Sequence, residues 1–229
     1  MMTGIIGAMS VETDALKAIV NNAIKETVSG VEFVRGTVNG HEVVVAQCGI
    51  GKVFAAICAQ TMILRYGVDQ IINTGVAGTL CDELGLLDIA ISTAVVEHDM
   101  DTSPLGDPVG LISGINIVEI PAAKKLAAKI ADAAADLKKK TALGIIASGD
   151  QFISDTEKKA YIRNTFHAIA CEMEGAAIGH VCYVNDVAFA VIRCISDNAD
   201  SEAGTMEYPE LCRRAAKQSQ ELIKKFFEI

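Results

Sequence analysis

The chain contains no tryptophan, and aromatic residues make up only 5% of its 229 positions. Hydrophobic residues nevertheless reach 51% and charged residues 21%, a balance typical of a folded globular protein and not of a disordered one. The core must therefore be built from Ala, Val, Ile and Leu. A chain of this length can bury most of its apolar surface, so we expect one domain over residues 1–229.

Basic residues are too few for a nucleic-acid binder. The formal net charge is −9 and the isoelectric point is near 4.9, whereas a protein that binds phosphates along a nucleic acid needs a basic face. The one short basic run, Lys138-Lys139-Lys140, follows a helical pattern and is interpreted as a solvated helix end. We expect no nucleic-acid partner.

Signals for export, membrane insertion and structural zinc are also lacking. None of the seven cysteines forms a CxxC pair, and most lie in apolar runs, which favours thiols in a reducing compartment. The segment MMTGIIGAMSVETDAL has no basic leader region, and no apolar run approaches membrane-spanning length. We expect a cytoplasmic protein with no membrane partner and no bound metal.

What the sequence does contain is an alternation of short apolar runs and helical patterns. Apolar runs with little polar alternation indicate strands buried on both faces, and their alternation with helices predicts an α/β fold with a mixed, largely parallel sheet. Asn39-Gly40 predicts a hairpin turn. The predicted strands are 4–9, 32–38, 41–48, 70–78, 86–98, 143–149 and 187–196, and the predicted helices include 11–22, 52–67, 121–140, 154–166 and 173–186.

Ligands of open α/β sheets bind beyond the carboxyl ends of the strands. The residues that follow the predicted strands are therefore candidates for a binding site. Four acids occur among them, namely Glu12, Glu172, Glu174 and Asp197, and two of these lie in the otherwise apolar stretch CEMEGAAIGHV. Each of three acids taken alone has a structural alternative: Glu12 and Glu174 as first-turn helix acids, and Asp197 as the N-cap of a turn.

Two further motifs occur at predicted strand ends. Gly49-Ile50-Gly51-Lys52 lacks the spacing of a phosphate-binding loop and is interpreted as a strand–helix turn. His98-Asp99 with Asp101 could bind a metal, but a loop hydrogen-bond network is favoured because no second histidine lies near. The long segment 99–114 is predicted to be a surface loop of functional interest.

Together, GIIGAM followed by Glu12, CGIGKV, INTGVAG, SGDQFI, EMEGAAIGHVC and RCISDNAD resemble the 5′-methylthioadenosine/S-adenosylhomocysteine nucleosidases. The resemblance covers essentially the whole chain. It implies a three-layer α/β/α fold of the nucleoside phosphorylase type, a homodimer, and hydrolysis of the N-glycosidic bond of both nucleosides without a cofactor. We expect adenine and the 5′-thio-substituted ribose as products.

The resemblance also implies residue roles. Asp197 would protonate the purine at N7, Glu12 would be the base for the attacking water, and Arg193 would orient Glu12 and the water. Glu174 would bind both ribose hydroxyls, and Glu172 would hold the water or Arg193. The remaining expected contacts to substrate come from Met9, Ile50, Val76, Ala77, Gly78, Phe152, Ile153, Met173 and Ser196, with Phe152 stacked on the purine, the Ile153 backbone at its Watson–Crick edge and Met173 against the sugar.

The chain departs from the resemblance at three places. Val76 stands where many of these nucleosidases carry serine. Leu105, in the 99–114 loop, stands where the partner subunit of relatives often lends a phenylalanine to the 5′-substituent pocket. Both Met206 and Tyr208 are candidates to close over the ligand. These changes bear on the preferred 5′ substituent.

The sequence is compatible with three other functions. Asn73 and Val76 stand where phosphorylases of this superfamily present Arg and Ser, and the chain has only six arginines, so water is favoured over phosphate as nucleophile. A purine nucleoside phosphorylase is still one alternative. Another is a hydrolase of a related nucleoside such as 6-amino-6-deoxyfutalosine, and a third is a nucleoside-binding protein without turnover.

Overall fold

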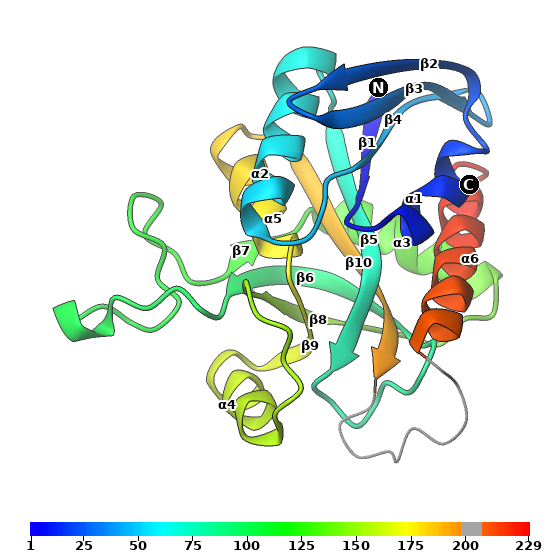
Figure 1. Cartoon of the computed structure of the whole chain (residues 1–229). Helices are drawn as coiled ribbons and strands as arrows, with labels where there is room; N and C mark the ends of the chain where they lie inside the picture. The colour runs from blue at the N-terminus through cyan, green and yellow to red at the C-terminus, as the bar shows by residue number, and fades with distance from the viewer. Residues whose placement is uncertain (198–207) are drawn as a thin grey trace.

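The computed structural model describes residues 1–197 and 208–229. Helices and strands alternate along most of this length (Figure 1). The strands are β1 (Met2–Gly7), β2 (Asn21–Val28), β3 (Val31–Val38), β4 (His41–Gln47), β5 (Gln70–Thr79), β6 (Ile89–Glu97), β7 (Ile120–Pro121), β8 (Thr141–Ser148), β9 (Ala168–Glu172) and β10 (Ala188–Asp197). The helices are α1 (Ser10–Lys17), α2 (Lys52–Thr61), α3 (Lys124–Asp136), α4 (Thr156–Phe166), α5 (Gly175–Val184) and α6 (Tyr208–Phe226), with short turns η1 (Met62–Tyr66) and η2 (Ser103–Leu105).

The strands form one mixed sheet in the order β10-β6-β8-β9-β5-β1-β4-β3-β2, with β7 paired to β6 and a further pairing between β10 and β5. The parallel pairs are β1–β4, β1–β5, β10–β5, β6–β8 and β8–β9. Antiparallel pairs join the β2–β3–β4 meander, and others join β10 to β6, β5 to β9 and β6 to β7. The carboxyl ends of five strands, and the residues that follow them, lie toward one region of the molecule. These strands are β1, β5, β8, β9 and β10.

Helices cover both faces of the sheet, which gives three layers (Figure 1). Helices α2 and α5 pack on each other over one face, and the core there includes Cys58 and Ile178. Helices α1, α3 and α6 cover the other face over a second cluster that includes Leu16, Ile130 and Phe226. The three-layer α/β/α fold expected from the sequence is therefore confirmed.

Three strands were not predicted. The helix predicted over 11–22 ends at Lys17, and β2 begins at Asn21. The side chains of β2 are mostly exposed at the sheet edge, so they carry no apolar pattern. Strands β7 and β9 have only two and five residues, too few for a period to be recognised.

By contrast, the hairpin predicted at Asn39-Gly40 is confirmed. Both residues have positive φ, and they join the antiparallel strands β3 and β4. Asparagine and glycine adopt this backbone conformation more easily than other residues, which is why the pair is a strong hairpin signal.

The segment between β6 and β7 forms an arm that projects from the body of the molecule (Figure 1). It contains the short turn η2 and a bridge between Ile112 and Ile117. The surface loop predicted over 99–114 is thus present as part of this arm. Within the described ranges, none of the helices is both long enough and apolar enough to span a bilayer.

Candidate functional site

A pocket lies where the strand ends of β1, β5, β9 and β10 meet. It is lined by Ala8, Met9 and Glu12 after β1, by Ile50 before α2, by Val76, Ala77 and Gly78 of β5, by Gln151, Phe152 and Ile153 after β8, by the run Cys171–Glu174, and by Ser196 of β10. Segments far apart in the sequence therefore contribute to one cavity. This is the location that the strand-end rule predicted.

Glu12 is buried in the first turn of α1, and its carboxylate faces three backbone donors. One oxygen accepts from the N–H groups of Ala8 at 2.8 Å and Met9 at 2.9 Å, and the other accepts from the N–H of Val76 at 3.2 Å. Burial raises the pKa of Glu12 above its usual value, while the hydrogen bond from Met9 and the charge of Arg193 oppose that rise. Glu12 is therefore both a first-turn helix acid and a pocket residue.

Glu174 is the N-cap residue of α5 and lines the same pocket as Glu12. One of its oxygens accepts from the N–H of Gly51 at 2.8 Å, and the other lies 3.7 Å from the guanidinium of Arg193. Burial, followed by the charge of Glu172, raises the pKa of Glu174 to about 7. This carboxyl group therefore exchanges its proton near neutral pH while it lines the cavity.

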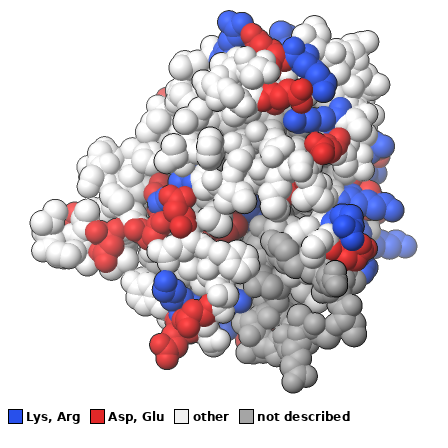
Figure 2. Space-filling model, viewed as in Figure 1, with Lys and Arg blue, Asp and Glu red and all other residues white. Residues whose placement is uncertain are grey.

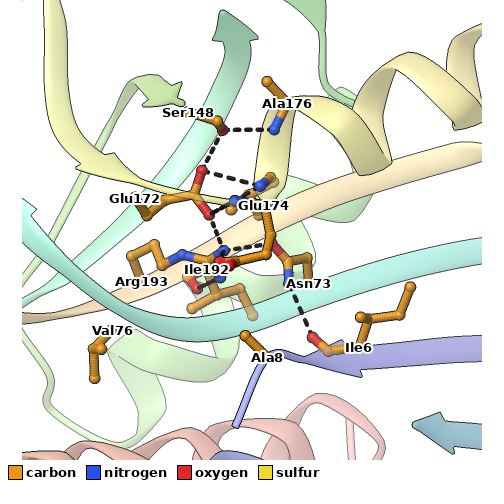
Figure 3. Close-up of polar contacts among 12 residues, drawn as sticks. Ile6, Ala8, Asn73, Val76, Ser148, Glu172, Glu174, Ala176, Ile192 and Arg193 are labelled. Atoms are coloured by element: carbon orange, nitrogen blue, oxygen red, sulfur yellow. Dashed lines mark hydrogen bonds and ion pairs between the residues drawn. The ribbon is translucent and has the colours of Figure 1, made fainter. Parts of the chain in front are cut away.

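Glu172, which lines the pocket, forms a buried ion pair with Arg193, which lies behind the pocket wall (Figure 3). Arg193 also donates to the side-chain oxygen of Asn73 at 2.6 Å and to the carbonyl of Ile192 at 3.1 Å. Burial opposes the charge of Arg193, but the carboxylates Glu172, Glu174 and Glu12 together hold its pKa above its ordinary value. One buried guanidinium thus offsets the charge of several buried acids.

A second polar network joins the root of the arm to the pocket rim. The ammonium of Lys52 donates to Asp99 at 2.7 Å and to Glu97 at 3.0 Å. Asp99 also accepts from the N–H of Asp150 at 2.8 Å, and Asp150 in turn accepts from the N–H of Lys52 at 2.8 Å. This supports the hydrogen-bond network predicted around Asp99. The residues of the two described ranges include no group of three or more His, Cys, Asp or Glu side chains arranged to hold a metal ion.

The structure brings most of the predicted site residues together, but not all of them. Arg193 is only 1% exposed and lies behind the wall, in contact with Glu172. Leu105 is 84% exposed on the arm and does not line the pocket of its own chain. The backbone of Asp197 ends β10 opposite Gly78, whereas its side chain and that of Tyr208 lie outside the described residues, as does Met206.

Three pocket residues were not among the expected substrate contacts: Ala8, Gln151 and Cys171. Each is the immediate neighbour of an expected contact, so extending every contact segment by one residue would have found them. Two partners of the buried network were also missed as site residues. Ser148 is the last residue of β8. Asn73 lies in the middle of β5, and its place where phosphorylases of this superfamily present Arg does not reveal that it accepts a hydrogen bond from Arg193.

Comparison with known proteins is consistent with this geometry. The family model of the phosphorylase superfamily matches residues 3–228, so the match includes every segment that lines the pocket. A 5′-methylthioadenosine/S-adenosylhomocysteine nucleosidase of Shewanella putrefaciens is 42% identical over 204 residues, which cover 89% of this chain and 88% of the relative.

Two solved structures are similar over nearly their whole length. One is a 5′-methylthioadenosine/S-adenosylhomocysteine nucleosidase from Colwellia psychrerythraea in complex with adenine, with a TM-score of 0.91, 34% identity and coverage of 100% of this chain and 95% of that one. The other is a futalosine hydrolase of Helicobacter pylori, with a TM-score of 0.91, 32% identity and coverage of 99% and 97%.

Proposed function

The chain belongs to the phosphorylase superfamily and, within it, to the 5′-methylthioadenosine/S-adenosylhomocysteine nucleosidases; from this premise we propose that it hydrolyses the N-glycosidic bond of both nucleosides. The products are adenine and the 5′-thio-substituted ribose. The observation that carries the proposal is the pair of buried carboxyl groups, Glu12 and Glu174, that line one pocket. All parts of this catalytic unit belong to one domain that spans the chain.

Glycosidic cleavage develops oxocarbenium character on the sugar, and adenine leaves poorly as an anion. In the proposed mechanism Asp197 protonates N7 of the purine as the bond breaks. Glu12 accepts a proton from the water that attacks the sugar carbon. The backbone N–H groups that surround Glu12 support this role because they hold the carboxylate in a fixed orientation beside the cavity.

The substrate is held by the other pocket residues. Glu174 accepts hydrogen bonds from both ribose hydroxyls, Met173 packs against the sugar, and Phe152 stacks on the purine. The backbone of Ile153 bonds the Watson–Crick edge of adenine. Phe152 lines the pocket and is 70% exposed at its rim, so its ring is accessible to a base that enters the cavity. The mechanism assigns no step to a cofactor.

A homodimer is part of the proposal. Apolar side chains are exposed along the N-terminal side of α2 and on α5, including Val53, Phe54 and Val184. Figure 2 shows that the surface over these helices carries few charged side chains. A second copy of the chain would cover this face, and its arm would bring Leu105 to the neighbouring pocket. Sedimentation equilibrium is expected to give twice the mass of the chain.

We place the enzyme in the cytoplasm. Cys48, Cys58, Cys182 and Cys194 are buried thiols that form no disulfide. Burial raises the pKa of the Cys58 and Cys182 thiols to about 12, so these two groups remain protonated. Buried thiols that are not oxidised are typical of proteins in a reducing compartment.

The experiment that tests the proposed function is adenine release from methylthioadenosine, followed by chromatography with and without phosphate. Hydrolysis predicts the same rate in both samples and free methylthioribose as the second product. Release only with phosphate, with a sugar 1-phosphate as product, would contradict it. If neither sample releases adenine, the futalosine-type nucleosides become the next substrates to assay, because the Helicobacter pylori hydrolase has an equally similar fold.

The affinity for the nucleoside is expected to depend on pH through Glu174. Its pKa is about 7, and only the deprotonated carboxylate offers two oxygens as acceptors to two hydroxyl groups. The deprotonated share falls from about one half at pH 7 to about one tenth at pH 6, so KM is expected to rise roughly fivefold over that unit. KM should be nearly constant above pH 8. The Glu174→Gln variant, which cannot titrate, should show a flat KM profile; a sloping profile in that variant would contradict the assignment.

A further inference from the structure

Helix α5 begins beside the pocket, and its N-cap residue does not cap it. Helix N-termini leave backbone N–H groups without partners, and a side chain at the N-cap position usually accepts one of them. Here the N-cap is Glu174, whose side chain makes no capping hydrogen bond. Its carboxylate is directed to the N–H of Gly51 and to the cavity instead.

The capping bonds come from two residues at the ends of neighbouring strands. The carboxylate of Glu172 accepts from the N–H of Glu174 at 3.0 Å and from the N–H of Gly175 at 2.9 and 3.0 Å. The hydroxyl of Ser148 accepts from the N–H of Ala176 at 2.7 Å and donates its own proton to Glu172. Strands β8 and β9 pair with Ser148 directly beside Glu172, so the sheet register fixes this arrangement (Figure 3).

We propose that Ser148 is a positioning residue for the sugar-binding carboxylate: together with Glu172 it caps α5 from outside the helix, and this leaves the Glu174 side chain available to the ribose hydroxyls. The proposal rests on the proposed nucleosidase function for the identity of the ligand. Ser148 is fully buried and does not line the pocket, so it acts only through Glu172 and the first turn of α5.

Loss of the Ser148 hydroxyl would remove two hydrogen bonds at the start of α5. In a Ser148→Ala variant the N–H of Ala176 has no acceptor, and Glu172 loses one of its donors. A buried backbone donor without a partner is costly, and the carboxylates at this helix end that can rotate toward it belong to Glu172 and Glu174. Either rotation is expected to disturb the carboxylate proposed to bind the sugar. The adenine end of the pocket, formed by residues 151–153, is expected to keep its geometry, because neither hydrogen bond lost in this variant involves those residues.

The test compares a ligand that carries ribose with one that does not. Ser148→Ala is expected to raise KM for methylthioadenosine about tenfold, a loss that matches one buried hydrogen bond, with kcat changed less than about twofold. The dissociation constant of adenine, measured by calorimetry, should stay within about twofold of the parent value because adenine has no sugar.

Ser92→Ala is the matched control. Ser92 is also fully buried, and its hydroxyl accepts from a backbone N–H, that of Val191, at 2.8 Å, but it lies in β6 and does not line the pocket. This variant should lower the melting temperature, and it should not weaken the binding of methylthioadenosine more than that of adenine. If Ser148→Ala does not fold, Ser148→Cys can replace it, because the thiol keeps a weaker donor and acceptor. Ser148→Cys should also raise KM for methylthioadenosine more than the dissociation constant of adenine, but by a smaller factor.

The positioning role would be overturned if Ser148→Ala weakened the binding of methylthioadenosine and of adenine equally, or changed neither. Failure of the proposed function is a distinct result, because the parent chain itself would then release no adenine from methylthioadenosine or would release it only with phosphate. In that case binding of the intact nucleoside can be titrated directly. The dissociation constant of the nucleoside is then divided by that of adenine, in Ser148→Ala and in the parent chain. A higher ratio in the variant supports the positioning role, and an equal ratio contradicts it.

Discussion

The Glu12→Gln variant is expected to release adenine about 10³-fold more slowly than the parent chain, with KM changed little. Glutamine has nearly the same shape but does not accept a proton at neutral pH, so the attacking water would lack its base. The measurement is kcat for methylthioadenosine under substrate saturation. Because burial raises the pKa of Glu12 in the parent chain, its kcat should also fall on acidification at a pH above the usual glutamate range.

The control for this variant is Asp14→Asn on the same helix. Asp14 is exposed, so the substitution removes a carboxylate of α1 without touching the pocket, and kcat should stay within about twofold of the parent value. The amide introduced by Glu12→Gln offers one acceptor oxygen where the carboxylate of Glu12 offers two to the backbone donors, so the melting temperature of this variant has to be measured as well. A folded Glu12→Gln variant with near-parent kcat would contradict the base assignment.

The Asp197→Asn variant is expected to bind methylthioadenosine but to lose nearly all turnover, by about 10³-fold or more. Its backbone position at the end of β10, opposite Gly78, puts it beside residues that line the pocket. Asparagine still donates a hydrogen bond to N7 but cannot transfer a proton to it, so adenine would have to leave as an anion. Single-turnover adenine release measures the loss directly.

A substrate that needs no acid separates this role from a structural one. The p-nitrophenyl glycoside of 5-methylthioribose releases p-nitrophenolate, which is stable as an anion. Asp197→Asn should therefore cleave this glycoside at a rate much closer to that of the parent chain than it cleaves methylthioadenosine. Equal losses on both substrates would mean that Asp197 acts in some way other than proton transfer to the base.

The location of the site could be predicted from the sequence because it depends on strand ends, which apolar runs and glycines mark well. Glu12, Val76 and Glu174 were found in this way, and all three line the pocket. The position of Arg193 behind the wall could not be predicted, since strand alternation does not show how far a long side chain reaches. The pairing of Ser148 with Glu172 depends on the register of β8 and β9, and β9 was too short to be recognised.

The limits of the fold prediction have a similar physical cause. β2 is held by its partner β3 and not by a buried apolar face, so its sequence NNAIKETV gives no local sign of a strand. The antiparallel pairs that make the sheet mixed are equally non-local. In contrast, α2, α5 and the strands between the two core clusters are specified by their own apolar residues, and these elements were predicted close to their observed positions.

The external cap of α5 restricts where the chain tolerates insertions and deletions. Only Met173 and Glu174 separate the last residue of β9 from the first residue of α5, and both line the pocket. One inserted residue would rotate the whole helix by about 100° against the core and turn the apolar side of α5 away from α2. Variation at this junction is therefore confined to substitutions at fixed length.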